Sequence, residues 1–186
     1  MSLHTISVLV EDKPGVLTRV AGLFAARGFN IDSLAVGPTG ESGLSRMTIV
    51  VDVETRPLEQ VTKQLNKLIN VIKILEHEPG GAVERELMLV KVRTKGDDRQ
   101  RVMEIASVFR VNVVDVTHST LTLEATGKPD KLEALLELLR DFGIVEVSRT
   151  GRIALARGDR GIRERVGGRR LAAVGDEPPE WTGGGV

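Results

Sequence analysis

The sequence contains no cysteine and no tyrosine, and aromatic residues make up only 3% of it. Without cysteine the chain has no disulfide framework and no thiolate for catalysis or metal binding, so a reducing cytoplasm is the expected location. Proteins that stack nucleic-acid bases need aromatic side chains on exposed strands. The segments expected to form the corresponding strands, residues 4–11 and 44–53, carry none, which argues against that class of function.

An excess of charge of one sign is also missing, because 26 Lys and Arg residues are balanced by 26 Asp and Glu residues. A balanced chain has no general attraction for nucleic acid or for an anionic membrane. No apolar run approaches the roughly 20 residues that cross a bilayer. Residues 1–15 lack the basic start and apolar centre of a signal peptide. We therefore expect a cytoplasmic protein whose partners include neither nucleic acid nor a membrane.

Patterns that indicate catalysis or metal binding are absent as well. The three histidines, His4, His77 and His118, are scattered and none has the spacing of a metal-ligand pair. The sequence has no Gly-x-Ser-x-Gly turn and no His-Glu-x-x-His motif. The glycines between residues 37 and 43 lack the Lys-Ser/Thr end of a phosphate-binding loop, so they predict a hairpin turn. We expect no catalytic residue and no metal ligand on this chain.

The chain does have one order of elements that occurs twice. Apolar alternation and helical spacing predict strand, helix, two strands, helix and strand in each half. The first set is expected at residues 4–11, 16–27, 30–36, 44–53, 57–68 and 70–78. The second is expected at residues 85–94, 97–110, 111–117, 121–126, 129–142 and 143–148. We therefore predict an α+β fold of two tandem ferredoxin-like βαββαβ domains, each with two helices on one face of an antiparallel sheet.

Composition gives the expected boundaries of these domains. Pro79-Gly80-Gly81 interrupts the periodic pattern and predicts a linker at residues 79–82, between domains at 1–78 and 83–157. A further short strand is expected at residues 153–156. Residues 158–186 are rich in arginine and then in glycine and proline, and this composition predicts a disordered tail.

The most informative stretch is Asp12-Lys13-Pro14-Gly15, between the first strand and the first helix. Pro14 is tolerated near a helix start, and Gly15 lets a ligand approach bare backbone. Free N–H groups and the positive end of the helix dipole favour a carboxylate or phosphate there. The simpler alternative is that Asp12 caps the helix and Gly15 only permits the turn. The second half has Gly-Asp-Asp-Arg at residues 96–99, so we expect such a site only in the first half.

Longer segments resemble one family of proteins. Residues 6–51, ISVLVEDKPGVLTRVAGLFAARGFNIDSLAVGPTGESGLSRMTIVV, are similar to the N-terminal ACT domain of the acetolactate synthase (acetohydroxyacid synthase) small, regulatory subunit. RELMLVKV at residues 85–92 and IVEVSRTGRIALARG at residues 144–158 extend the resemblance into the second half. The opening loop alone indicates a generic amino-acid-binding ACT domain, and the later segments make the resemblance specific.

The resemblance implies a regulator that is not itself a catalyst. Such subunits bind the large catalytic subunit, raise its activity and make it sensitive to valine. Their ACT domains pair as a homodimer, sheet edge to sheet edge, with the amino acid at the interface. The resemblance also implies that thiamine diphosphate, Mg and FAD belong to the catalytic partner and that this chain carries no cofactor.

The family's ligand loop falls on Asp12, Gly15 and Asn30, with Asp at position 12 where the family pattern has Asn. A zwitterion needs donors for its carboxylate and acceptors for its ammonium group. Backbone N–H groups of Lys13, Gly15 and Val16 would supply the donors, and Asp12 and the Asn30 side-chain oxygen would supply the acceptors. Ile31, Leu34 or Val16 would give an apolar wall for a branched side chain. The expected valine-site residues are Asp12, Lys13, Gly15, Val16, Asn30 and Ile31.

Two other interpretations remain at this point. One is a stand-alone ACT amino-acid sensor that acts on another partner, such as a transcription factor. The other is a small ferredoxin-like enzyme of the acylphosphatase kind, whose phosphate-binding loop requires an arginine. The loop here has Lys13 and no arginine, which argues against the enzyme.

Overall fold

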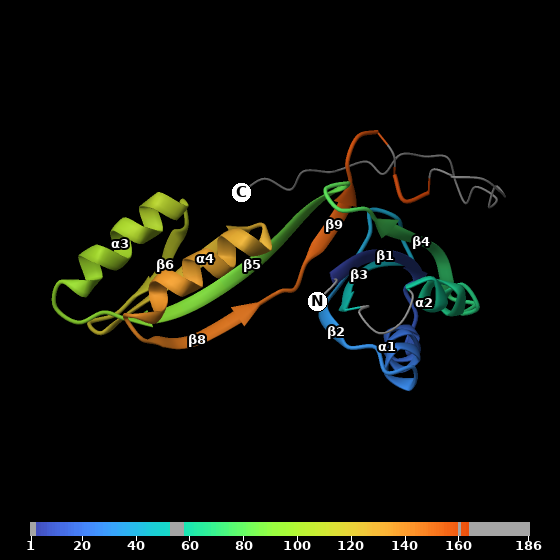
Figure 1. The fold of residues 1–186 in the computed structure, drawn as a ribbon, viewed down its shortest axis with the longest axis horizontal. Coiled ribbons are helices and arrows are strands. Elements are labelled where there is room, and N and C mark those ends of the chain that lie inside the picture. Colours follow the sequence, from blue (N-terminus) through green and yellow to red (C-terminus); the bar gives the residue numbers. More distant parts are fainter. Residues whose placement is uncertain (1–2, 53–57, 160, 164–186) are drawn as a thin grey trace.

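The computed structural model describes residues 3–52, 58–159 and 161–163. Within them the chain forms two lobes joined by long strands (Figure 1). The elements are β1 (Leu3–Glu11), α1 (Val16–Ala26), β2 (Ile31–Pro38), β3 (Leu44–Asp52), α2 (Leu58–Leu65), β4 (Val71–His77), β5 (Ala82–Arg93), α3 (Asp98–Phe109), β6 (Asn112–Val116), β7 (Thr120–Gly127), α4 (Pro129–Arg140), β8 (Ile144–Arg149) and β9 (Ile153–Ala156). The expected start of the second helix at Pro57 and most of the expected tail lie outside the described residues.

The first lobe is an antiparallel sheet in the order β2-β3-β1-β4, with α1 and α2 on one face. Alternate residues of β1 point toward the helices, as the period of a strand requires. The fully or almost fully buried side chains that meet there include Ile6, Val8, Val20, Phe24 and Ile49. We refer to this lobe as the ACT unit.

The second lobe repeats the arrangement. Its sheet has the order β6-β7-β5-β8, with each strand antiparallel to its neighbours, and β9 pairs with the start of β5. A separate core fills the space under α3 and α4, with Val90, Val102, Leu123 and Leu135 all fully buried. The predicted fold of two tandem βαββαβ units is therefore confirmed, and we call this lobe the second unit.

One strand is longer than the sequence pattern predicts. Ala82, expected in a linker, is already the first residue of β5, which runs 12 residues to Arg93. A tight turn precedes it, because Gly81 N–H donates to the carbonyl of Glu78 at 2.8 Å and Gly80 has φ of 76°. Residues 82–85 pair with residues 153–156 of β9, so the first third of β5 belongs to a two-stranded ribbon. At about 3.4 Å per residue, β5 extends about 40 Å between the two lobes.

Candidate functional site

The loop that precedes α1 is exposed and ends at Gly15, which has φ of 82° and is the N-cap residue of the helix. Lys13 N–H donates to the carbonyl of Glu11 at 3.1 Å, and Val16 N–H donates to the carbonyl of Lys13 at 3.3 Å. Two of the three expected carboxylate donors are therefore used inside the loop. Within the described part of the chain, the N–H groups of Gly15, Leu17 and Thr18 make no hydrogen bond. The donors that α1 offers to a carboxylate are therefore the N–H groups of Gly15, Leu17 and Thr18. The sequence predicted only the first of these.

Val16 is one of the residues expected to form an apolar wall for the ligand's side chain, but the structure gives it a different role. Its side chain is only 4% exposed and packs in the core under α1. It fixes the start of the helix to the sheet, so that the free N–H groups beside it keep their direction. Asp12 is exposed, and its N–H donates to the carbonyl of Gly43 at 2.8 Å. Because Gly15 occupies the cap position without a side-chain hydrogen bond, the alternative in which Asp12 caps the helix is not what the structure has.

A chain of polar contacts holds this loop in place, and sequence analysis missed it. Lys13 Nζ lies 3.0 Å from Glu11 Oε2, and the same carboxylate accepts a hydrogen bond from Asn70 Nδ2 at 2.7 Å. Asn70 Oδ1 in turn accepts from Arg19 Nη1 at 2.8 Å. The hydrogen bond from Asn70, followed by that from Lys13, lowers the pKa of Glu11. The loop is therefore braced against β4 and α1 by charge-assisted bonds.

Asn30 and Ile31 lie at the other end of the ACT unit. Ile31 opposes Val51 on β3, which opposes His4 at the start of β1, whereas Glu11 at the end of β1 opposes Leu44. Helix α1 separates the two ends, and its 11 residues span about 16 Å. Within one chain, Asn30 and the free N–H groups beside Gly15 cannot contact the same small molecule.

Strand β2 is the outer strand of the ACT sheet, and only β3 pairs with it among the described residues. Leu34 and Ile31 are half-buried against the core of the unit. An unpaired strand edge offers a row of backbone N–H and C=O groups to another strand. A second copy of this chain is therefore able to extend the sheet along β2.

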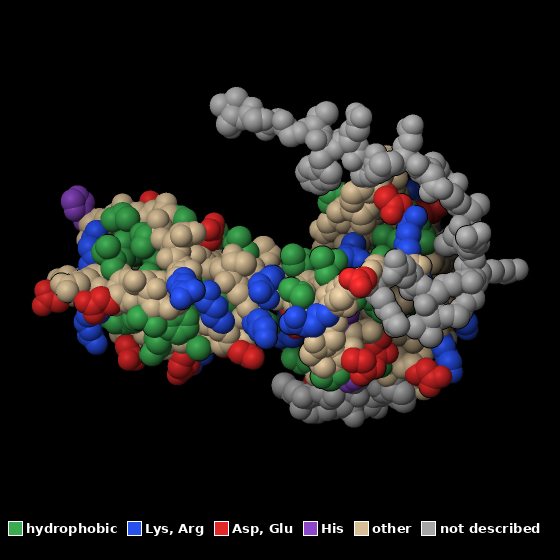
Figure 2. All heavy atoms as spheres, turned by 90° about the horizontal axis from the view of Figure 1, so that it is seen from above, with side chains coloured by type: hydrophobic (Ala, Val, Ile, Leu, Met, Phe, Trp, Pro, Cys, Tyr) green, Lys and Arg blue, Asp and Glu red, His purple; other side chains and the backbone are tan. Residues whose placement is uncertain are grey.

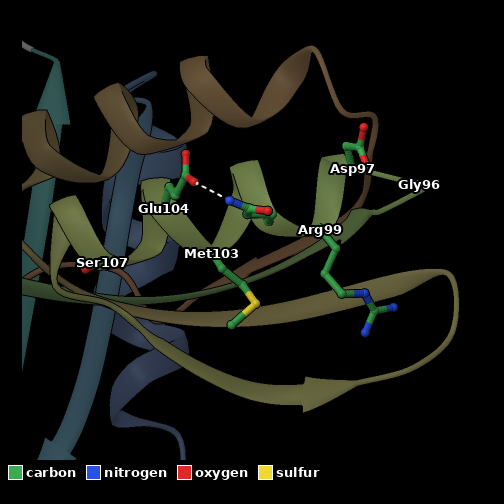
Figure 3. A pocket seen from close by; sticks show the side chains of 7 residues that line it. Gly96, Asp97, Arg99, Met103, Glu104 and Ser107 are labelled. Atoms are coloured by element: carbon green, nitrogen blue, oxygen red, sulfur yellow. Dashed lines mark hydrogen bonds between the residues drawn. The ribbon is translucent and has the colours of Figure 1, made fainter.

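The equivalent place in the second unit is built differently. Helix α3 begins after Asp97 and carries Asp98 in its first turn, so acidic side chains already lie at its positive end. A shallow hollow of about 490 Å³ runs along the outer side of this helix, where Arg99 and Met103 point toward the β6–β7 hairpin (Figure 3). Gln100 Nε2 donates to Glu104 Oε1 at 3.0 Å on the same surface. This helix start offers no unopposed donor cluster for a carboxylate.

Among the residues that the structure describes, no group of three or more His, Asp or Glu side chains lies close enough together to hold a metal ion. Within the same part of the chain, none of the helices is both long and apolar enough to cross a membrane.

Comparisons with known proteins agree over both units. Residues 6–73 match the family described as the AHAS small subunit-like ACT domain, and residues 85–158 match the family described as the small subunit of acetolactate synthase. The acetolactate synthase small subunit of Mycolicibacterium smegmatis is 60% identical over 159 residues, which cover 86% of this chain and 94% of that protein. A probable acetolactate synthase small subunit of Methanothermobacter thermautotrophicus is 52% identical over 158 residues, 84% of this chain and 94% of that protein.

A solved structure gives the same result for the arrangement in space. The crystal structure of the acetolactate synthase small subunit from Thermotoga maritima superposes with a TM-score of 0.79 at 40% sequence identity. The match covers 86% of this chain and 99% of that one, so it includes both units together.

Proposed function

The chain belongs to the family of acetolactate synthase small subunits, and from this membership we propose that it activates the large catalytic subunit and confers feedback inhibition by valine on it. Leucine and isoleucine are the other candidate ligands, because they share the zwitterion and the branched apolar side chain of valine. Thiamine diphosphate, Mg and FAD are assigned to the catalytic partner in this proposal, and this chain supplies only regulation.

The proposed valine site lies between two copies of the chain. The observation that carries it is the separation of Asn30 from Gly15, which lie at opposite ends of α1. If two β2 strands pair antiparallel about a twofold axis, the start of each strand lies beside the end of the other. The end of β2, at Pro38, opposes Ser45, two residues after Gly43, whose carbonyl accepts from the Asp12 N–H group. Such pairing therefore brings the partner's β2 start to the end of the sheet that carries the loop.

Each group of the ligand has a partner in this arrangement. The carboxylate faces the N–H groups of Gly15, Leu17 and Thr18 at the positive end of α1. The ammonium group faces Asp12 of one chain and the Asn30 oxygen from the second. Ile31, which is half-buried at the start of β2, contacts the aliphatic side chain. A ligand that touches both chains shifts the population of their arrangements, which is the basis of inhibition at a distance.

An activity assay tests the regulatory part of the proposal. The purified chain is expected to form no acetolactate from pyruvate with thiamine diphosphate, but to stimulate its large subunit several-fold and make it sensitive to valine. Gly15→Asp is expected to abolish valine inhibition and leave stimulation intact, because it adds negative charge where the carboxylate binds. Gly96→Asp, at the equivalent loop of the second unit where φ is 55°, is the matched control and should keep inhibition. Turnover by the isolated chain would reject the proposal.

A mixing experiment tests whether two chains share the site. Neither Gly15→Asp nor Asn30→Ala should bind valine alone in calorimetric titration. A mixed dimer of the two variants contains one site with both defects and one site with none. Equimolar random mixing makes about half of the dimers mixed, so it should restore about a quarter of the binding capacity of the unmodified chain. If each site were built within one chain, no mixed dimer would contain an intact site and mixing would restore nothing.

A further inference from the structure

The ribbon formed by the start of β5 and by β9 lies on the face of the ACT sheet opposite its helices. Thr5 Oγ1 donates to Glu84 Oε1 at 2.7 Å, and Ser7 Oγ donates to the carbonyl of Ala154 at 3.4 Å. Ala154 is only 2% exposed, so the ribbon excludes water from this face of the sheet. The two units are thus in direct contact through side chains as well as through the continuous chain.

A further contact of this kind joins β2 to the turn from β8 to β9. Gly151 has φ of 81°, and a Cβ atom there would lie 2.9 Å from Ser33 Oγ and 3.1 Å from the carbonyl oxygen of Leu34. Arg152 N–H donates to the same Ser33 Oγ at 2.8 Å. Both the backbone conformation and the close approach therefore require glycine at this position. We call these four residues, Ser33, Leu34, Gly151 and Arg152, the latch.

The latch connects the strand at the proposed ligand site to the second unit. Ser33 follows Ile31 on β2 by two residues, so a ligand that moves the start of β2 moves the latch. On the other side, Thr150 N–H donates to the carbonyl of Leu87 at 3.1 Å, which ties the turn to β5. A cleft of about 530 Å³ runs along this seam, with Asp32, Arg149 and Arg152 among its lining residues. Figure 2 shows basic side chains gathered between the two lobes.

We propose that the latch transmits the state of the valine site from β2 to the second unit, so that inhibition depends on it and stimulation of the catalytic subunit does not. This inference rests on the proposed valine site. With the latch closed, a displacement of β2 reorients the second unit. With the latch opened by substitution, valine still binds between the ACT units but the second unit no longer responds. Coupling between two sites typically changes an affinity by about 5- to 150-fold. Opening the latch should remove the part of valine inhibition that depends on this coupling.

The test compares Gly151→Ala with Gly158→Ala in the full chain. Gly158 has nearly the same backbone conformation, with φ of 78°, but a Cβ atom there would meet nothing within 4 Å. The control therefore reproduces the conformational strain without the clash. Should Gly151→Ala fail to fold, Ser33→Ala removes only the acceptor of the Arg152 N–H group and is expected to act in the same direction.

Three measurements distinguish the outcomes. Because the chain has no cysteine of its own, spin labels can be attached to two introduced cysteines, Gln60→Cys on α2 and Ala134→Cys on α4. The labelled chain is then diluted into unlabelled chain. In Gly151→Ala, the distribution of distances between the two labels should broaden. Valine binding in the calorimeter and stimulation of the catalytic subunit should stay unchanged. The valine concentration needed for inhibition should rise at least about fivefold. Gly158→Ala should behave as the unmodified chain does.

The latch proposal is overturned if Gly151→Ala keeps a narrow distance distribution, or if valine inhibits it as well as the unmodified chain. A different result identifies failure of the proposed function. If the unmodified chain binds no branched-chain amino acid in the calorimeter, the valine site itself is rejected, and the latch proposal is rejected with it.

Discussion

The ion pair between Arg149 and Glu86 makes the sharpest stability prediction. Arg149 Nε and Nη2 each donate to a different oxygen of Glu86 at 2.8 Å, and Nη1 donates to Glu133. The Glu86 side chain is only 5% exposed. The hydrogen bonds to Glu86, the largest effect, raise the pKa of Arg149 and so favour the charged guanidinium. Arg149→Ala would leave the carboxylate of Glu86 buried without its cation.

The size of the effect follows from the burial of the two partners. Removing one member of a buried pair costs about 3–5 kcal/mol, because the other charge stays desolvated. The Arg149 side chain is 30% exposed, so water reaches part of the pair and the loss should fall near the low end of that range. We expect Arg149→Ala to lower the free energy of unfolding by about 3 kcal/mol. Glu86→Gln combined with Arg149→Met should recover much of this loss, since neither charge is then left alone.

Urea unfolding followed by circular dichroism is the appropriate assay. The chain has no tyrosine, and its single tryptophan, Trp181, lies outside the described residues. Arg140→Ala is the matched control, because Arg140 Nη1 lies 2.8 Å from Glu137 and both side chains are about two-thirds exposed. An exposed pair of this type contributes at most about 0.5 kcal/mol. If the two arginine variants lose equal stability, the reasoning about the burial of Glu86 is wrong.

Three other predictions concern the ACT unit. Phe24→Ala should cost about 3–5 kcal/mol in urea unfolding, because Phe24 is fully buried and packs edge to face on Phe29. Gly28→Ala should cost about 1–2 kcal/mol in the same assay, since φ is 67° there, whereas Gly22→Ala, inside α1 with open space around it, should stabilise by about 0.5–1 kcal/mol. Burial lowers the pKa of His77, so the unfolded chain binds more protons and stability should fall as pH drops below about 6.5. His77→Gln should flatten that part of the stability curve measured in urea at several pH values.

Local patterns predicted most of the fold because local chemistry determines it. Apolar spacing predicted the helices and strands. Gly28, with φ of 67° just after α1, has the left-handed conformation that glycine typically adopts at a helix end. The features of the fold that the local pattern did not predict depend on contacts with residues far along the chain. The early start of β5 at Ala82 requires β9, which opposes it more than seventy residues later. Asn70 reaches Glu11 across 59 residues, and no periodicity marks it.

The candidate site shows the same limit. Gly15 and Asn30 are close in sequence, and the family resemblance assigned both to one ligand. The helix between them puts them at opposite ends of the unit, and only the sheet register makes this clear. Likewise, the hydrogen bonds of Lys13 and Val16 inside the loop could not be read from residue types. The family resemblance implied a site between two chains, and the sheet register gives a physical reason for it that the residue pattern alone does not contain.

Asp12 gives the last prediction, because it departs from the asparagine of the family pattern. In the proposed site its carboxylate accepts from the ligand ammonium group, and such charge-assisted bonds are roughly twice as strong as neutral ones. Asp12→Asn keeps the shape and one acceptor oxygen, loses the charge, and replaces the second oxygen by an NH2 donor. We expect valine binding to weaken about fivefold, a loss of about 1 kcal/mol. We also expect binding by the unmodified chain to weaken more with added salt than binding by the variant, since salt screens an exposed charge pair. Tighter binding by Asp12→Asn would mean that position 12 lies beside the ligand carboxylate instead, and the ammonium group would then have to be assigned to Asn30 alone.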